Sequence, residues 1–233
     1  MCKELEDVKV VCFDLDETLY DQLEPFSLAL QSENITIESS LIEPVFKKVR
    51  FYSDLLWKSY TNGKIDLDEL RTERLIRSCN DFNLDLSKEK ASLIQTAYEE
   101  QQNSIKPFSG VKSLIINLQK NNKLVGIITN GPVEHQLNKI SALELHLLIP
   151  RNKIFISDEI GIAKPDKRIF QFVQEQLAVD SHQCCYIGDN WENDIAAPIE
   201  AGWKTIWFNY RNRDSETCHS PNKVIEDYKN FMI

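Results

Sequence analysis

The sequence feature that most constrains this chain is a short apolar run that ends abruptly in carboxylates. Residues 8–13, Val-Lys-Val-Val-Cys-Phe, have the composition of a buried strand, and Asp14, Asp16 and Glu17 follow at once. In open α/β sheets, ligands bind at the carboxyl ends of the strands. Three acidic groups this close repel one another, and each tends to stay protonated unless a cation neutralises it. The stretch therefore predicts a strand that brings carboxylates to a cation, although an acidic turn that caps a helix would show the same pattern.

Length and charge limit the classes of fold and partner. The chain has 233 residues, enough for one sizeable domain or for a core domain with a second one inserted. Its formal net charge is -9, from 27 basic and 36 acidic residues, and nothing in that balance attracts nucleic acid or an anionic membrane surface. We therefore expect neither nucleic acid nor membrane as a partner.

The N-terminal segment and the cysteines argue against further classes. The first residues are acidic and lack the apolar stretch of a signal peptide, and no run reaches the roughly 20 apolar residues of a membrane span, so a cytoplasmic protein is expected. The cysteines are scattered without a Cys-x-x-Cys pair, which favours reduced thiols over a zinc or redox site. They are Cys2, Cys12, Cys79, Cys184, Cys185 and Cys218.

A block with helical spacing follows the first strand and covers residues 21–105. Pro44 suits the first turn of a helix, and Asn62-Gly63 supplies a stop. Asp66 and Ser87 suit the N-caps of two further helices. Because the block has no strand pattern, we expect a helical domain inserted directly after the first strand.

From Phe108 onward, apolar runs typical of strands alternate with segments of helical spacing. This alternation predicts an α/β fold, a doubly wound parallel (Rossmann-like) sheet with helices on both faces. The core domain would comprise residues 1–20 and 106–233, and the polar segment from Asn209 to Asn222 would be a surface loop. The strands expected after the first are 124–129, 153–156, 184–188 and 205–208.

Polar residues stand at the ends of three expected strands, where a packed core has no use for them. They are Asp14 and Asp16, Thr129, and Asp189. Lys164 lies on a loop in the sequence Gly-Ile-Ala-Lys-Pro-Asp, whose proline suits the first turn of the next helix. Because parallel strands bring their carboxyl ends to one edge of the sheet, these residues are expected to converge into one site.

Each of these segments also has a less specific interpretation. Asn130-Gly131 is a common hairpin turn, but the helical spacing that follows favours a strand, a loop and a helix. Asp189 and Glu200 have the spacing of the first and last ligands of a calcium loop, but Trp191 stands where that loop needs an oxygen ligand. Lys164 alone would more often be a solvated surface lysine.

Taken in order, the motifs resemble those of the haloacid dehalogenase-like hydrolases. The motifs are Asp14-x-Asp16-x-Thr18, Thr129-Asn130-Gly131, Lys164-Pro165 and Gly188-Asp189-x4-Asp194. The resemblance covers essentially the whole chain, and the helical insertion is similar to the cap of subfamily I. Four motifs in order are far more specific than one.

The resemblance implies a two-step reaction carried by two carboxylates. Asp14 would be the nucleophile that forms an aspartyl-phosphate, and Asp16 the general acid and then the general base. Dehalogenases of the family have no leaving alcohol to protonate and lack the second aspartate. Asp16 therefore points to phosphoryl transfer.

The resemblance also implies a phosphate site and a metal site. The expected phosphate-binding residues are Thr129, Asn130, Gly131 and Lys164, which would face the charge that spreads over the phosphoryl oxygens. The expected Mg²⁺ ligands are Asp14, the backbone carbonyl of Asp16, and Asp189, with Asp194 orienting that shell or reaching the metal itself.

Local sequence around the motifs narrows the resemblance further. Tyr20-Asp21 and the Gly131-Pro-Val-Glu-His stretch look most like the branch that contains nucleotidases and acylneuraminate phosphatases. The expectation is a Mg²⁺-dependent phosphatase of a small phosphorylated metabolite, a nucleoside monophosphate or a sugar phosphate, acting as a monomer or weak homo-oligomer. The alternatives are a phosphomutase of sugar phosphates and a non-catalytic binding module on the same fold.

Overall fold

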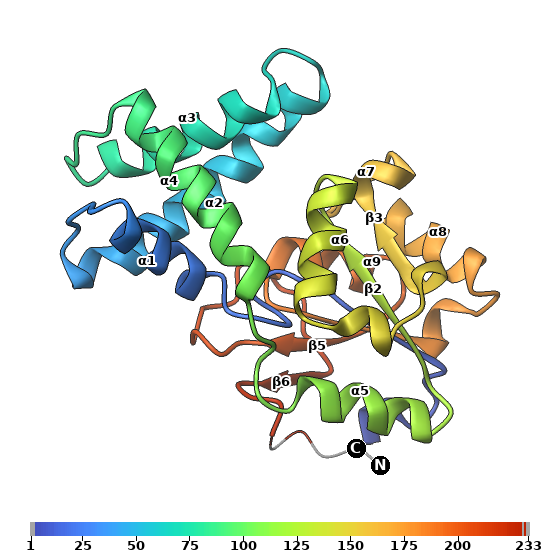
Figure 1. The fold of residues 1–233 in the computed structure, drawn as a ribbon. Coiled ribbons are helices and arrows are strands. Elements are labelled where there is room, and N and C mark those ends of the chain that lie inside the picture. Colours follow the sequence, from blue (N-terminus) through green and yellow to red (C-terminus); the bar gives the residue numbers. More distant parts are fainter. Residues whose placement is uncertain (1–2, 230, 232–233) are drawn as a thin grey trace. The chain divides into compact units, whose positions relative to one another are not determined.

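The structure is a computed structural model that describes residues 3–229 and 231. The chain forms two compact units, a core unit of Met1–Asp21 with Ile105–Ile233 and a helical unit of Gln22–Ser104. The core unit contains a parallel sheet with its covering helices, and the regular elements of the helical unit are all helices (Figure 1).

In the described part of the core unit, one sheet of six parallel strands has the order β3-β2-β1-β4-β5-β6. The strands are β1 Val10–Phe13, β2 Leu124–Thr129, β3 Ile154–Ile156, β4 Cys184–Gly188, β5 Lys204–Phe208 and β6 Lys223–Ile225. Phe13 of β1 is paired in register with Ile127 of β2 and with Ile187 of β4. The residues that follow these three central strands therefore emerge side by side at the carboxyl edge of the sheet.

Helices cover both faces of this sheet. They are α5 Val111–Lys120, α6 Val133–Ala142, α7 Ser157–Ile160, α8 Arg168–Gln176 and α9 Ala197–Glu200, with 3₁₀ turns η1 Lys3–Leu5, η3 Leu145–Leu147, η4 Arg151–Lys153 and η5 Ser181–Gln183 and the π-helical turn η6 Trp191–Ala196. Val11 of β1 packs in one core with α5 and α6, and Cys12 packs in a second core with α8 and α9. Because successive strand residues point to opposite faces, this two-sided burial explains why β1 is apolar throughout.

The helical unit contains α1 Leu23–Ser32, α2 Ser39–Thr61, α3 Leu67–Asn80, α4 Lys88–Gln101 and the 3₁₀ turn η2 Gln102–Ser104. Both predicted N-caps are confirmed. The Asp66 carboxylate accepts the N–H of Glu69 at 2.7 Å, and the Ser87 hydroxyl accepts the N–H of Lys90 at 3.3 Å. The predicted stop is also confirmed, because α2 ends with Asn62 as its C-cap.

The prediction for Pro44 is wrong. The helix α2 begins at Ser39, so Pro44 lies one turn further in than expected. A proline removes the hydrogen bond to the carbonyl four residues earlier, here that of Ser40 at the very start of the helix. The loss is small so close to the N-terminus, and the helix can extend back past the proline.

The fold class is confirmed, while the short edge strand β6 was not predicted. Three residues, Lys223–Ile225, are too few to show a periodic pattern, and β6 becomes a strand only by pairing in parallel with β5. The assignment of 21–105 as a cap domain, with 1–20 and 106–233 as the core, stays a prediction. Its boundaries differ by one residue from those of the two compact units.

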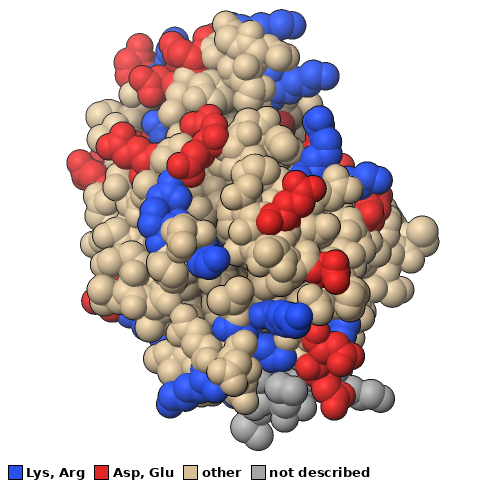
Figure 2. Space-filling view, turned by 90° about the vertical axis from the view of Figure 1, so that its right-hand side faces the viewer, with Lys and Arg blue, Asp and Glu red and all other residues tan. Residues whose placement is uncertain are grey.

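One face of the protein carries charged side chains of both signs. Acidic and basic side chains are interspersed over the face seen in Figure 2. None of the helices in residues 3–229 combines the length and apolar character needed to cross a membrane. The cysteines at 12, 79, 184, 185 and 218 are free thiols, and Cys2 lies outside the described residues.

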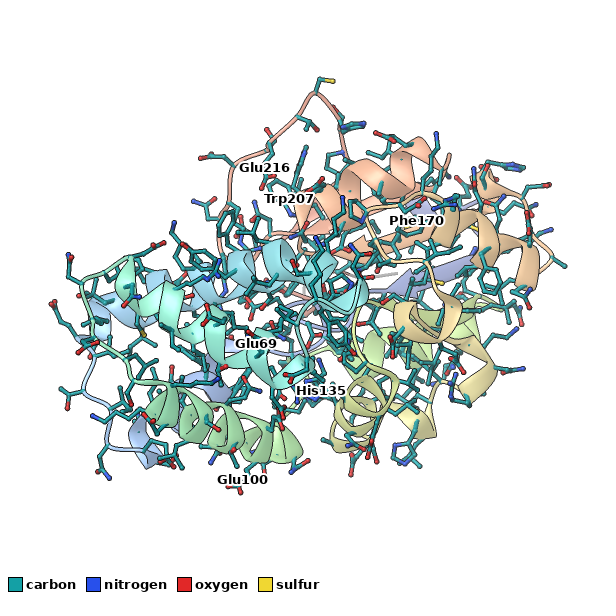
Figure 3. All side chains as sticks on the ribbon, turned by 90° about the horizontal axis from the view of Figure 1, so that it is seen from above. Glu69, Glu100, His135, Phe170, Trp207 and Glu216 are labelled. Atoms are coloured by element: carbon teal, nitrogen blue, oxygen red, sulfur yellow. The ribbon has the colours of Figure 1, made fainter. Side chains whose placement is uncertain are left out.

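The core beneath the sheet offers a test of the architecture at Phe170 of α8 (Figure 3). Its fully buried ring meets Tyr186 and Trp203 edge-on, at centroid distances of 5.1 and 5.4 Å. We predict that Phe170→Ala lowers the free energy of unfolding by about 3–5 kcal/mol, measured by urea denaturation, because the ring leaves a cavity. The control Leu147→Ala, at a side chain that is 72% exposed, should change it by less than about 0.5 kcal/mol. Equal effects of the two variants would contradict this packing.

Candidate active site

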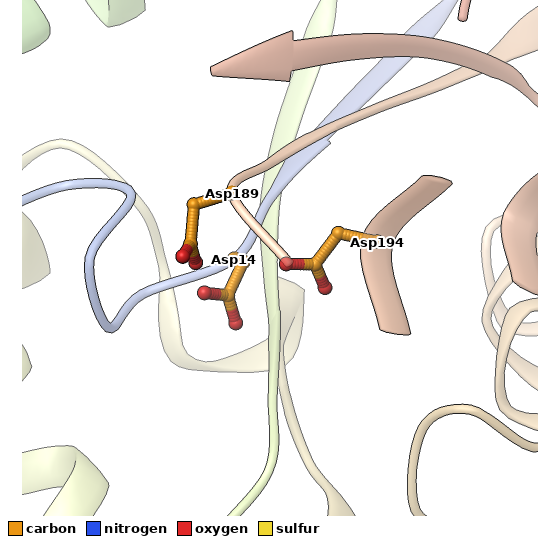
Figure 4. Close-up of side chains that lie close together, drawn as sticks. All are labelled: Asp14, Asp189 and Asp194. Atoms are coloured by element: carbon orange, nitrogen blue, oxygen red, sulfur yellow. The ribbon is translucent and has the colours of Figure 1, made fainter. Parts of the chain in front are cut away.

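Three buried carboxylates meet at the carboxyl edge of the sheet (Figure 4). Asp14 follows β1, Asp189 follows β4, and Asp194 lies on the π-helical turn η6. Each offers an oxygen that lies within 4.8 Å of the others, and their residues are only 6%, 2% and 1% exposed. The predicted convergence of these acids is therefore seen in the structure.

The glycine that ends β4, directly before Asp189, makes this approach possible. A Cβ atom at Gly188 would collide with the side chain of Asp194. The Asp194 carboxylate can then turn toward the strand end, where its Oδ2 accepts the backbone N–H of Asn190 at 2.9 Å. The fourth motif thus needs a glycine at position 188 because a larger residue would leave no room for the Asp194 side chain, which the sequence pattern alone did not reveal.

Lys164 is the cation at the centre of this cluster. Its Nζ donates to Asp14 Oδ1 at 2.8 Å, to Asp194 Oδ1 at 2.6 Å and to the hydroxyl of Tyr186 at 2.8 Å. Tyr186 in turn donates to the carbonyl of Ile128 at 2.6 Å. Lys164 is therefore a buried site residue and not a solvated surface lysine.

The loop that carries Lys164 differs from the expectation in one detail. Pro165 does not lie in the first turn of α8, which begins at Arg168, but in the preceding turn, after a cis peptide bond. The side-chain amide of Asn130 holds this loop from the other side, donating to the Lys164 carbonyl at 2.8 Å and accepting the Lys164 N–H at 3.0 Å. Asn130 thus fixes the backbone from which Lys164 reaches the acids.

Burial and charge act in opposite directions on these groups. Burial raises the pKa of Asp14 and of Asp194 above the ordinary range, against the lowering effect of the Lys164 ammonium group. Burial alone would lower the pKa of Lys164, but its ion pairs with both carboxylates hold that pKa above the usual value. The site therefore keeps Lys164 charged, while it makes Asp14 and Asp194 harder to ionise than carboxyl groups in water.

Asp16 lies in a separate environment, two residues after Asp14. Its oxygens accept hydrogen bonds from Lys139 Nζ at 2.5 and 2.6 Å, from the Tyr20 hydroxyl at 2.5 Å and from Gln136 Nε2 at 3.1 Å. Burial alone would raise the pKa of Asp16, but Lys139 and these hydrogen bonds outweigh it and hold the pKa well below the usual range. Asp16 is therefore an anion in this arrangement.

The strand-end motif after β2 joins the two environments. Thr129 Oγ1 accepts a hydrogen bond from Gln136 Nε2 at 2.5 Å, and the same amide group donates to Asp16. The Gly131 N–H donates to Ser157 Oγ at 3.1 Å. Lys164 therefore contacts the acids directly and Thr129 is linked to Asp16 through Gln136, whereas Asn130 and Gly131 hold neighbouring loops.

Sequence reasoning missed several polar residues of this site. Gln136 and Lys139 are three apart on α6 and are buried together with Ile140 on the apolar face of a segment for which only helical spacing was predicted. A buried pair of polar residues within such a face was the signal that could have found them. Tyr186 was hidden inside an apolar strand, and Arg213, which donates to Asp189 Oδ2 at 2.7 Å, lies in a segment interpreted as a surface loop.

The donor set at this edge fits a hard divalent cation. Three closely spaced carboxylates supply oxygen ligands of the kind that Mg²⁺ prefers. Lys164 contacts one oxygen each of Asp14 and Asp194, and Arg213 contacts Oδ2 of Asp189, so two cationic side chains face three carboxylates and a cation could balance the remaining charge. Asp14, Asp189 and Asp194 are the side chains that could hold it.

Comparisons with known proteins agree with this geometry. The pyrimidine 5'-nucleotidase YjjG of Escherichia coli (strain K12) is 30% identical over 216 residues, and the match covers 92% of each chain. The glyceraldehyde 3-phosphate phosphatase of Pyrococcus abyssi is 28% identical over 208 residues, 87% of this chain and 82% of its own. Among solved structures, magnesium-bound YfnB of Bacillus subtilis superposes with a TM-score of 0.73 at 23% identity, over 95% of this chain and 96% of its own.

The family follows from the length of the match. The sequence model of the haloacid dehalogenase-like hydrolases matches residues 8–202, from the first strand to the end of the fourth motif and beyond. This range contains the three acids and the lysine that meet at the sheet edge. The chain therefore belongs to the haloacid dehalogenase-like hydrolase family, as the order of its motifs predicted.

Proposed function

We propose that this enzyme hydrolyses small phosphomonoesters with Mg²⁺ and that Asp14 carries the phosphoryl group between the two steps. The enzyme is a phosphoric monoester hydrolase of its family, as the names of its relatives indicate. The observation that carries the mechanism is the pairing of two neighbouring carboxylates with separate lysines, Asp14 with Lys164 and Asp16 with Lys139.

The first step needs a nucleophile with a fixed direction. The Asp14 carboxylate is held by Lys164 through Oδ1 and by the Thr18 hydroxyl through Oδ2, at 2.8 and 3.3 Å. One of its oxygens would attack phosphorus while the bond from phosphorus to the substrate alcohol breaks. Thr129 and Lys164 would supply a hydrogen bond and a positive charge to the phosphoryl oxygens.

Asp16 would move the protons. Asp16 would protonate the departing alcohol in the first step, and in the second it would take a proton from the water that attacks phosphorus and releases Asp14. The ion pair with Lys139 keeps Asp16 in its basic form, which is the form needed for the second step. The first step therefore requires Asp16 to have left Lys139 and to carry a proton before the alcohol departs. The proton that Asp16 takes from water in the second step supplies the first step of the next turnover.

A divalent cation would complete the site. Mg²⁺ would be held by Asp14, Asp189 and Asp194, with the Asp16 carbonyl, and would offset the charge of the acids and of the phosphate ester when bound. Lys164 supplies one fixed charge beside Asp14, and Arg213 holds Oδ2 of Asp189. Lys164 and Arg213 would thus hold the carboxylates in position without a bound metal ion.

The relatives narrow the substrate class. They are named pyrimidine 5'-nucleotidase and glyceraldehyde 3-phosphate phosphatase, so a nucleoside monophosphate or a small sugar phosphate is the proposed substrate. A panel of both classes, scored by released phosphate, tests the proposal. Conversion of a hexose phosphate to its isomer without phosphate release would indicate a phosphomutase instead.

Replacing the nucleophile tests the role of Asp14. We predict that Asp14→Asn lowers turnover at least about a thousand-fold, because an amide cannot form the intermediate. The thermal unfolding midpoint, followed by circular dichroism, should show a folded protein, since the shape of the side chain is kept. Turnover near that of the wild type would remove Asp14 from the mechanism.

Removal of divalent cations tests the metal. Phosphate release should stop in excess EDTA and return when Mg²⁺ is added beyond the chelator, because three buried carboxylates repel an anionic ester without it. Asp189→Asn should need a higher Mg²⁺ concentration for the same rate. Full activity in EDTA would contradict the metal site.

The ion pair of Asp16 can be tested through stability. Lys139→Met is expected to lower the free energy of unfolding by about 3 kcal/mol, because the partly buried Asp16 carboxylate loses its buried ammonium partner. The double variant Asp16→Asn/Lys139→Met should be more stable than the single one, as urea denaturation would show. Lys112→Met, at an exposed ion pair with Glu144, is the control. A double variant less stable than Lys139→Met would contradict the pairing.

A further inference from the structure

The segment that follows β5 is tightly fixed although it lies outside every helix and strand. The Asn209 side chain donates to the carbonyl of Arg213 at 2.9 Å and accepts the Arg213 N–H at 2.7 Å. The Asn209 N–H donates to the carbonyl of Ile225 on β6 at 2.7 Å. These bonds close the five residues from Asn209 to Arg213 into a compact turn, which we call the arginine turn.

The arginine turn presents three polar side chains to the loop that carries the nucleophile. The hydroxyl of Tyr210 and Nε of Arg211 donate to Glu17 Oε2 at 2.7 and 2.8 Å. Arg211 also donates through Nη2 to Asp21 Oδ1 at 2.7 Å. Glu17 itself is fully buried and has a φ of 64°, a left-handed backbone conformation that a residue other than glycine rarely adopts. A buried charge in a strained conformation needs such partners to persist.

Arg213 connects this loop with the acid cluster. Its Nη1 donates to Asp189 Oδ2 at 2.7 Å, and its Nη2 lies 3.7 Å from Glu17 Oε2. The two carboxylates follow different strands, Glu17 after β1 and Asp189 after β4. A planar guanidinium group can face two carboxylates at once, which a lysine ammonium group does less well.

We infer that Arg213 is a positioning residue that bridges Glu17 and Asp189 and thereby holds the Asp189 carboxylate in place for a divalent cation. The inference rests on the proposed function, since it assigns Arg213 to the metal site of that reaction. Asp189 is fixed a second way, because Trp207 Nε1 donates to its backbone carbonyl at 2.9 Å (Trp207 is labelled in Figure 3). Arg213 therefore controls the carboxylate, while Trp207 fixes the main chain.

Two effects of the Arg213 charge oppose one another. A guanidinium group beside the site repels a divalent cation, but it also fixes one oxygen of Asp189 and offsets the repulsion among the buried acids. Arg213 donates to Oδ2, so an ion that binds the other oxygen would not have to displace it from Oδ2. Orientation should therefore outweigh repulsion, as outer-shell partners of metal ligands usually raise affinity.

Calorimetric titration with Mg²⁺ alone, without substrate, tests the inference. Arg213→Gln should weaken Mg²⁺ binding by about ten-fold relative to the wild type. Arg213→Lys keeps the charge but can reach one carboxylate at a time, so it should recover part of the loss. Arg151→Gln is the control, because it makes the same substitution at an exposed arginine of the core unit, one that is paired with Glu159. This variant should bind Mg²⁺ like the wild type.

Kinetics on p-nitrophenyl phosphate at saturating Mg²⁺ add a second readout. Arg213→Gln should lower kcat with KM changed less than about two-fold, because Arg213 would orient a metal ligand and would not contact the ester. Unfolding followed by circular dichroism shows whether each variant is folded. If Arg213→Gln does not fold, Arg213→Lys decides in the same titration, with weaker Mg²⁺ binding than the wild type as the expected result.

The outcomes separate this inference from the proposed function. Weaker Mg²⁺ binding by Arg213→Gln, partly recovered in Arg213→Lys, supports the bridge. If the wild type binds Mg²⁺ and the folded Arg213 variants bind it as tightly or more tightly, the bridge is overturned while the proposed function stands. If the wild type binds no Mg²⁺ at all, both fail together.

Discussion

The active site depends on keeping several acids buried at one edge of a sheet. Buried carboxylates repel one another and lose their hydration, so each must find a cation or take up a proton. Lys164 meets this need for two of them, because its ammonium group lies between Asp14 and Asp194. The Tyr186 hydroxyl on β4 accepts a hydrogen bond from the Lys164 ammonium group, and the Asn130 side-chain amide holds the Lys164 main chain. The position of the nucleophile therefore follows from the placement of one lysine.

The cations of the site come from separate parts of the core unit. Lys139 is on α6, Lys164 on the loop before α8 and Arg213 on the turn after β5. Each is paired with a different acid, so Asp16, Asp14 and Asp189 have distinct electrostatic environments. Two aspartates only two residues apart can then have different tasks, since their pKa values are pushed in opposite directions. Parallel strand order makes this possible by bringing distant segments to the same edge.

The sequence predicted the parts of the fold and site that depend on local pattern. The apolar strands and the caps at Asp66 and Ser87 were visible because burial on both faces and helix starts leave local signatures. Lys139 and Arg213 were not visible, because their importance comes from partners more than a hundred residues away or from another strand end. The edge strand β6 was missed for the same reason, since pairing with β5 makes it a strand. The order of the motifs was enough to predict which acids form the site. The cations that pair with them, Lys139 and Arg213, could be identified only from the tertiary structure.

The central claim is that Asp14 attacks phosphorus and is then released by water. The stereochemical course at phosphorus tests it most directly, with an ester whose phosphorus is made chiral by oxygen isotopes and an acceptor alcohol in place of water. Two in-line displacements, the first by Asp14, each invert the configuration, so the account predicts overall retention. Overall inversion would show a single direct displacement on the ester and would contradict the account.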